Sequence, residues 1–251
     1  MCIRDRVYGD GALGSRGAVL KNPYCDDPHN YGILRTSADD LKYYAKEIAE
    51  MGFQMNTHAI GDSTVSVLLN EYKKVLNKID DPRWRIEHSQ VVDVNEFELY
   101  NEKILPSIQP THATSDMYWA YDRLGSRIKG AYAFKDLLKS SNRVALGTDF
   151  PVEKVNPFHT FYSSVERKDL KGYPENGFQM ENSLSREETL KGMTIWGAYF
   201  NFEEHEKGSL EVGKSADFVV LNQNIMEVEA DLIPNTEVLQ TYIDGELVYS
   251  K

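Results

Sequence analysis

The chain has 251 residues, with 28 Lys and Arg against 39 Asp and Glu, and a formal net charge of -11 at pH 7. This length suits one large domain, or one domain with a small satellite. The negative charge and the lack of a long basic run exclude nucleic acid and anionic membranes as expected partners. No run of about 18 apolar residues occurs, so the sequence predicts no membrane span.

The cysteine content excludes a disulfide framework. Cys2 and Cys25 form no CxxC or CxxxC pair, and a reducing, cytoplasmic setting is expected. Residues 1–6 do not follow the pattern of a secretory signal. They run directly into what resembles the middle of a domain. We therefore interpret residues 1–6 as a non-native leader and the chain as a fragment.

Strand and helix patterns alternate over the first 82 residues. Residues 7–8 read as the end of a strand, and a glycine-rich loop follows at 10–17. Ser37 is predicted to cap a helix that ends at Gly52. A strand at 53–57 leads to a second helix, for which Asp62 is the predicted cap. The 3.6-residue period gives that helix a buried stripe of Val65, Leu68, Leu69, Tyr72 and Leu76.

The alternation continues to about residue 207. Three further strands are predicted, at residues 83–88, 104–109 and 143–148. Helices are predicted from Asp93 to Tyr100, at 132–139, at 158–167 and from a Ser185–Glu188 capping box through Ala198. Loops are predicted at 115–127 and 169–183.

The last 45 residues have a different character. Residues 218–221 read as a strand, and 238–248 read as a hairpin around Asp244–Gly245, a pair that favours a type I′ turn. A β-rich tail after a βα series indicates a small separate β unit.

Chemically active side chains stand at the ends of the predicted strands. They are Asp10, His58, His88, His112 and Asp149. Parallel strands end at one edge, so we expect these side chains to converge. Imidazole nitrogens and a carboxylate suit a divalent metal, zinc best of all. A catalytic zinc lowers the pKa of a bound water, and a neighbouring carboxylate can pass the proton to a leaving nitrogen.

Each of these residues also has an ordinary structural explanation. A single strand-end histidine is more often structural than a ligand, and His112 could cap a turn, bind a metal or contact substrate. Asp10 could stabilise the glycine-rich loop and nothing more. Arg16 and Arg127 are candidate anion contacts, or solvated surface. Glu87 precedes His88 and points to the other side of its strand, and His29, His159 and His205 lie away from the strand ends.

Five motifs in order resemble amidohydrolase family 3, namely DGALGSRGA (10–18), HAIGD (58–62), RIEHSQ (85–90), QPTHATSD (109–116) and GTDFPVEKVNP (147–157). This is the branch of the metal-dependent amidohydrolase superfamily that includes N-substituted formamide deformylase. The segment GSLEVGKSADFVVL (208–221) resembles the family's return to its β-sandwich.

The resemblance implies an α/β fold, a partial (β/α)8 TIM-type barrel (strands 4–8) at residues 7–206, and part of a small β-sandwich at 207–251. It implies that His58 and His88 bind one or two divalent metal ions, with zinc as the expected metal. Asp149 would handle the proton of the nucleophilic water. His112 is expected to contact the substrate, with Asp10 and Arg16 as further candidate contacts. The implied reaction is hydrolysis of a carbon–nitrogen, non-peptide bond of the amide type in a small molecule.

The chain departs from the family pattern in two places. The family's HxH pair is absent, and Arg6 stands where the family has a lysine that is carboxylated to bridge two metals. Arginine cannot form that bridge, because its guanidinium stays charged and only donates. The resemblance thus implies that three barrel strands and half the β-sandwich are missing, and that the longer parent is the enzyme.

Two other hypotheses stay open. One is a non-catalytic, degenerate barrel that binds a small molecule or a partner. The other is a metal-free barrel enzyme in which Asp149 acts without zinc. A homodimer is also a possible state, because many barrels pair.

Overall fold

The structure is a computed structural model that describes residues 4–251. Contacts within the chain divide it into two compact units. Unit 1 contains residues 4–108 and 115–144, and unit 2 contains residues 109–114 and 145–251. Among the described residues, none of the helices has both the length and the apolar character needed to span a bilayer.

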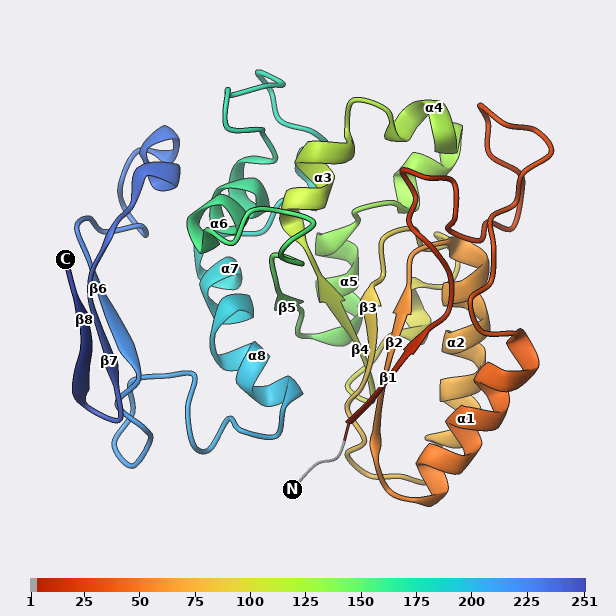
Figure 1. The fold of residues 1–251 in the computed structure, drawn as a ribbon, viewed down its shortest axis with the longest axis horizontal. Coiled ribbons are helices and arrows are strands. Elements are labelled where there is room, and N and C mark those ends of the chain that lie inside the picture. Colours follow the sequence, from red (N-terminus) through yellow and green to blue (C-terminus); the bar gives the residue numbers. More distant parts are fainter. Residues whose placement is uncertain (1–3) are drawn as a thin grey trace. The chain divides into compact units, whose positions relative to one another are not determined.

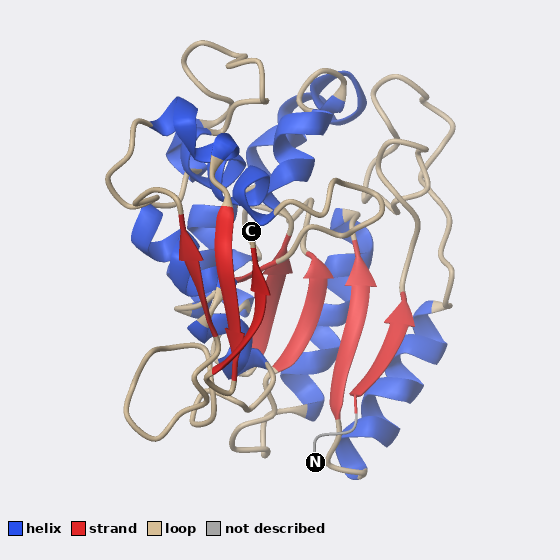
Figure 2. Ribbon diagram, turned by 60° about the vertical axis from the view of Figure 1, so that its left-hand side comes forward, coloured by secondary structure: helices blue, strands red, loops and turns tan. Residues whose placement is uncertain are grey.

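Unit 1 is built on four parallel strands in the spatial order β1-β2-β3-β4 (Figure 1). Their bounds are β1 Arg4–Tyr8, β2 Gln54–Ala59, β3 Trp84–His88 and β4 Ile104–Ile108. Tyr8 pairs with His58, and Ala59 pairs with His88. The strands point the same way (Figure 2), so the ends of β1, β2 and β3 share one edge.

The predicted leader is only partly covered by the structure, because residues 1–3 lie outside the described residues. Arg4, Asp5 and Arg6 belong to β1, in register with Gln54, Met55 and Asn56 of β2. The predicted strand end at Tyr8 is confirmed.

Two helices follow β1 and β2 in unit 1, as predicted. Ser37 caps α1 (Ala38–Glu50), where its Oγ accepts the Asp40 N–H at 3.1 Å. The predicted stripe of α2 (Asp62–Val75) is at most 1% exposed at every position, and α2 packs on β3 and β4. Burying such a stripe supplies most of the stability of an amphipathic helix.

The predicted cap of α2 is wrong. Gly61 is the N-cap, with no side-chain hydrogen bond, and Asp62 is the first helical residue. Asp62 Oδ1 instead accepts the N–H of Lys21 at 2.8 Å, a contact across the fold that local spacing cannot reveal.

The predicted loop at 115–127 is also wrong, because much of it is helical. It falls within α3 (Pro110–Asp116), α4 (Ala120–Leu124) and the 3-10 helix η2 (Gly125–Gly130). Residues 110–114 of α3 belong to unit 2, and unit 1 also contains η1 (Phe97–Leu99) and α5 (Phe134–Ser141). The N-cap of η1 is Glu96 rather than the predicted Asp93.

The second segment of unit 2, residues 145–251, begins with a strand much shorter than predicted, β5 (Ala145–Leu146). The helix α6 (Pro157–Glu166) follows, capped by Asn156, and η3 (Met180–Asn182) interrupts the predicted loop at 169–183. The Ser185–Glu188 capping box is confirmed at the start of α7 (Arg186–Met193). The helix does not continue through Ala198, because Thr194 leaves helical geometry (φ -126°, ψ -97°) and α8 (Ile195–Phe200) begins after it.

A three-stranded antiparallel sheet ends the chain, in the order β6-β7-β8. Its strands are β6 Phe218–Leu221, β7 Val238–Ile243 and β8 Glu246–Ser250, and η4 (Ala230–Asn235) lies between the first two. The predicted hairpin is confirmed, and Asp244 (φ 51°) and Gly245 (φ 80°) both have the positive φ that a type I′ turn requires. The expected α/β fold with a parallel sheet is thus confirmed, whereas the closed barrel and the β-sandwich stay predictions.

Candidate functional site

Two histidines lie together at the carboxyl edge of the sheet in unit 1. His58 is the fifth residue of β2, and His88 ends β3. Their ring centroids are 4.5 Å apart, edge to face, and the Tyr8 ring lies 5.4 Å from that of His58. Their side chains are largely buried, with His58 only 12% exposed. The structure thus brings together the two histidines that strand pairing predicted to converge.

The backbone at the end of β3 is strained. His88 (φ 75°) and Ser89 (φ 43°) both have positive φ. Two hydrogen bonds hold this turn: Tyr100 Oη donates to Ser89 Oγ at 2.8 Å, and Ser89 Oγ donates to Ile86 O at 3.0 Å. Such conformations cost about 1–3 kcal/mol each and concentrate at functional sites. Asp149 in unit 2 also has positive φ (58°).

Asp10 is a buried carboxylate that organises the backbone beside His58. Its Oδ2 accepts the N–H groups of Val19 and Gly61, each at 2.9 Å, and its Oδ1 accepts that of Ile60 at 3.0 Å. Burial raises the pKa of Asp10, and these hydrogen bonds oppose the rise. Asp10 Oδ1 lies 3.8 Å from His58 Nε2. The geometry favours loop stabilisation, and substrate contact by Asp10 stays a prediction.

Arg16 is engaged with another loop residue. Its guanidinium makes two hydrogen bonds to Asp26, at 3.1 and 2.8 Å, and this pairing lowers the pKa of the Asp26 carboxyl. Arg123 also reaches Asp26, at 3.2 Å, and Arg127 donates to the carbonyls of residues 22 and 23 at 2.6 Å each. These arginines tie loops of unit 1 together, and substrate contact by Arg16 stays a prediction.

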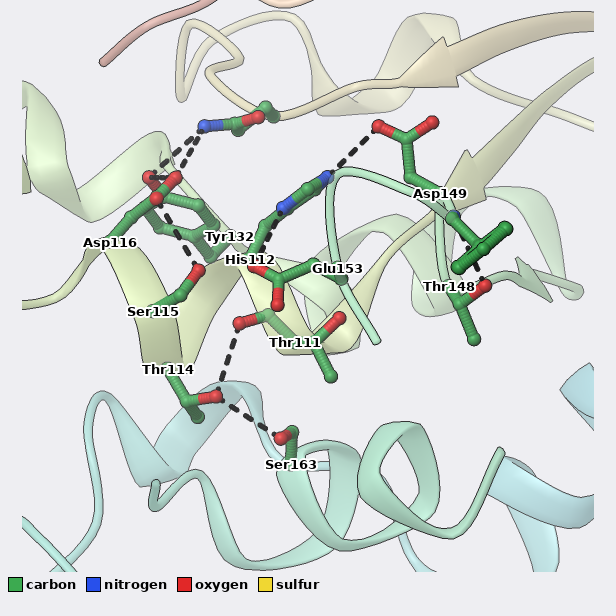
Figure 3. Close-up of polar contacts among 12 residues, drawn as sticks. Thr111, His112, Thr114, Ser115, Asp116, Tyr132, Thr148, Asp149, Glu153 and Ser163 are labelled. Carbon is green, nitrogen blue, oxygen red and sulfur yellow. Dashed lines mark hydrogen bonds and ion pairs between the residues drawn. The ribbon is translucent and has the colours of Figure 1, made fainter. Parts of the chain in front are cut away.

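In unit 2, His112 lies between two carboxylates (Figure 3). His112 Nε2 is 3.3 Å from Asp149 Oδ2, and His112 Nδ1 is 3.4 Å from Glu153 Oε1. The three side chains are 11%, 29% and 21% exposed, respectively. The segment that carries His112 is held to α6 by Thr114 Oγ1 and Ser163 Oγ, 3.1 Å apart. Two predicted site residues, His112 and Asp149, therefore lie in direct contact.

Sequence reasoning missed Glu153, although the motif at 147–157 contains it. It also missed a polar network in unit 1 that includes Asp116 and Tyr132 (Figure 3). Gln90 Nε2 donates to Asp116 Oδ2 and to Tyr132 Oη, each at 3.1 Å, and Tyr132 Oη donates to Asp116 Oδ2 at 2.8 Å. Gln90 and Asp116 stand in quoted motifs, but no spacing rule joins them to Tyr132.

The donor set suits a divalent metal. His58 and His88 present adjacent imidazoles, and imidazole nitrogen is a preferred ligand of zinc. The neighbouring Asp10 carboxylate is already committed to three backbone N–H groups, so it is not a freely oriented ligand. Its distance of 3.8 Å from His58 Nε2 is too long for a hydrogen bond.

Comparisons with known proteins also indicate a metal-dependent hydrolase. The family model described as "Amidohydrolase family" matches residues 6–249. The chain is 33% identical over 249 residues to Protein LONG AFTER FAR-RED 3 of Arabidopsis thaliana, covering 97% of this chain and 42% of that protein. It is 33% identical over 250 residues to YtcJ of Bacillus subtilis (strain 168), whose name gives amidohydrolase as a provisional activity, covering 98% of this chain and 47% of that protein.

A solved structure of an uncharacterized metal-dependent hydrolase from Pyrococcus horikoshii is also similar. The match has a TM-score of 0.77 at 29% identity and covers 90% of this chain and 45% of that one. The chain thus spans less than half the length of the curated relatives it matches. The resemblance to amidohydrolase family 3 is confirmed over nearly the whole sequence. The chain belongs to the amidohydrolase family.

Proposed function

We propose that this chain forms part of a metal-dependent hydrolase that cleaves carbon–nitrogen bonds in small, non-peptide amides. One observation carries the proposal: His58 and His88 pack ring to ring, 4.5 Å apart, at the carboxyl edge of a parallel sheet. That edge is where barrel enzymes present their chemistry. Membership of the amidohydrolase family supports the same reaction class.

The proposal gives each residue a role. His58 and His88 would hold a divalent metal ion, and zinc suits their imidazole nitrogens best. A bound zinc ion supplies Lewis acidity, which lowers the pKa of water towards neutrality. Asp149 takes a proton from the attacking water. As the carbon–nitrogen bond breaks, Asp149 returns that proton to the leaving nitrogen.

The remaining predicted residues act around this reaction. His112 contacts the substrate beside Asp149, and Asp10 keeps the β2–α2 turn and the glycine-rich loop in place. The relative named N-substituted formamide deformylase, from Arthrobacter pascens, is 21% identical over 268 residues. N-substituted formamides are therefore suitable first substrates for a screen, with other small amides beside them.

We also propose that these 251 residues do not complete the site by themselves. They contain no HxH pair, and Arg6 stands at the position of the bridging lysine. Arginine supplies no ligand oxygen or nitrogen lone pair. The chain should therefore take up zinc through His58 and His88 but hydrolyse amides poorly or not at all. The cysteine content fits a cytoplasmic protein, and a homodimer is proposed because many barrels pair.

Zinc titration of the purified chain tests the proposal. We expect uptake by the wild type, and loss of that uptake in His58→Asn and His88→Asn. His205→Asn is a matched control, because the side chain of His205 is 91% exposed. Equal zinc uptake by the wild type and both site variants would overturn the proposal.

The second candidate is a non-catalytic barrel that binds a small molecule, and the missing HxH pair and Arg6 favour it. A version of the protein that carries both the HxH pair and the lysine separates the two. Zinc-dependent amide hydrolysis by that version supports the enzyme, and zinc uptake with no hydrolysis of any amide in the screen supports the binding protein.

A further inference from the structure

We infer that Glu153 is a positioning residue that acts through His112. It holds the imidazole proton on Nδ1 and so directs Nε2, with its ring orientation fixed, at Asp149. The geometry of this contact stands by itself. Its consequence for amide hydrolysis rests on the proposed function.

The contacts of His112 define the inference. Its Nδ1 lies 3.4 Å from Glu153 Oε1, and its Nε2 lies 3.3 Å from Asp149 Oδ2 (Figure 3). A neutral imidazole has one N–H and one lone pair, so it cannot donate to two carboxylates at once. When the ring is neutral, the carboxylate that accepts its N–H therefore decides which nitrogen carries the proton, whereas an imidazolium would donate to both.

Glu153 is the less exposed of the two carboxylates, at 21% against 29% for Asp149, and the proposed hydrolysis leaves Asp149 to exchange a proton with water. The loop after β5 turns back at Asp149, where the N–H of Val152 donates to the carbonyl of Asp149 at 2.8 Å. Three residues after Glu153, Asn156 caps α6 by accepting the Phe158 N–H at 2.9 Å. The backbone that carries Glu153 thus lies between a closed turn and a helix start, on the same loop as Asp149.

The tautomer matters chemically because it determines what His112 Nε2 presents to Asp149. A histidine whose Nδ1–H is held by a carboxylate keeps one tautomer and one ring orientation. His112 then presents the Nε2 lone pair towards Asp149, the group that carries a proton in the proposed hydrolysis. Without Glu153, the Nε2–H tautomer would become favourable, because Asp149 could accept that proton.

Nuclear magnetic resonance of the intact chain tests the tautomer directly. Two-bond ¹H–¹⁵N spectra, recorded without metal at a pH where His112 is neutral, distinguish Nδ1–H from Nε2–H. The His112 signals are identified by their loss in His112→Gln. We expect Nδ1–H in the wild type and a shift to Nε2–H in Glu153→Ala. A wild-type ring that is already Nε2–H, or an unchanged tautomer in Glu153→Ala, would overturn the inference.

Control variants separate positioning from folding. Glu153→Asp keeps a carboxylate and should restore part of the wild-type tautomer. Glu175→Gln removes an exposed glutamate from the same unit and should leave the spectrum unchanged. If Glu153→Ala fails to fold, Glu153→Gln keeps the shape of the side chain. Because an amide is a weaker acceptor, it should give a mixture of both tautomers, and a pure Nδ1–H spectrum would count against the inference.

Kinetics on an active version of the protein give the second measurement. Loss of a residue that orients a site group costs about 10–100-fold in activity. We expect that loss in kcat for Glu153→Ala, a much smaller change in KM, and partial recovery in Glu153→Asp. If the wild type hydrolyses no amide, the proposed function fails, while the tautomer measurement still decides the role of Glu153.

Discussion

Asp10 offers the sharpest test of how the loops beside His58 are held. Its buried carboxylate accepts three backbone N–H groups, from Val19, Ile60 and Gly61, at 2.9–3.0 Å. These come from two segments far apart in sequence. Asp10→Ala would remove all three acceptors at once. Asp10→Asn would keep one carbonyl oxygen and place an NH₂ donor against at least one of the three backbone N–H groups.

The expected loss in the free energy of unfolding follows from these hydrogen bonds. Each buried N–H left without an acceptor costs about 1–3 kcal/mol. Three such groups set a gross loss of about 3–9 kcal/mol for Asp10→Ala, and part of it is offset because no carboxylate needs to be buried. We therefore expect a net loss of about 3–5 kcal/mol in the free energy of unfolding for Asp10→Ala, and about 1–3 kcal/mol for Asp10→Asn.

Urea denaturation, followed by tryptophan fluorescence, measures both variants. Asp122→Asn is the control, because Asp122 is an exposed aspartate of the same unit and should change the unfolding free energy by less than about 0.5 kcal/mol. If Asp10→Ala unfolds within about 0.5 kcal/mol of the wild type, Asp10 does not hold these loops, and the assigned role is wrong.

Three smaller predictions concern caps, buried hydroxyls and pH. Ser185→Ala removes the capping box of α7 and should cost about 1 kcal/mol in a thermal melt, whereas no change would contradict the cap. Tyr72→Phe removes a 2.6 Å hydrogen bond to buried Thr57 and should cost about 1–2 kcal/mol in urea denaturation; an equally stable variant would show that the bond is neutral. The hydrogen bond from Arg16 lowers the pKa of the Asp26 carboxyl in the folded protein. The ion pair therefore stabilises the fold fully at pH values above the pKa of Asp26 in the unfolded chain, and this stabilisation is lost as pH falls through its pKa in the folded protein. The free energy of unfolding of Asp26→Asn should therefore be closer to that of the wild type at pH 3 than at pH 7. An equal difference in unfolding free energy at both pH values would contradict this.

Local patterns predicted the elements whose cause is local. The stripe of α2 and the Ser37 and Ser185 caps follow from spacing along the chain, and the structure confirms them. The wrong predictions of helix starts and ends arise where contacts between residues distant in sequence determine the structure. The backbone N–H of Lys21 donates to the carboxylate of Asp62, so this carboxylate does not cap the N-terminus of α2. No local sequence pattern predicts the interruption of the helix at Thr194.

The same division holds for the candidate site. Strand ends were enough to predict that His58 and His88 would meet, because parallel pairing fixes which residues share an edge. Glu153 was missed because its partner, His112, is distant in sequence and the contact depends on the turn after Asp149. Gln90 was missed for a similar reason, since its partners come from two other segments.

The central claim is that His58 and His88 bind one metal ion. A crystal of the zinc-loaded protein, measured at the zinc absorption edge, tests it most directly. The account predicts an anomalous peak about 2.0–2.1 Å from one ring nitrogen of each histidine. A zinc ion held by other side chains, with neither His58 nor His88 as a ligand, would contradict it.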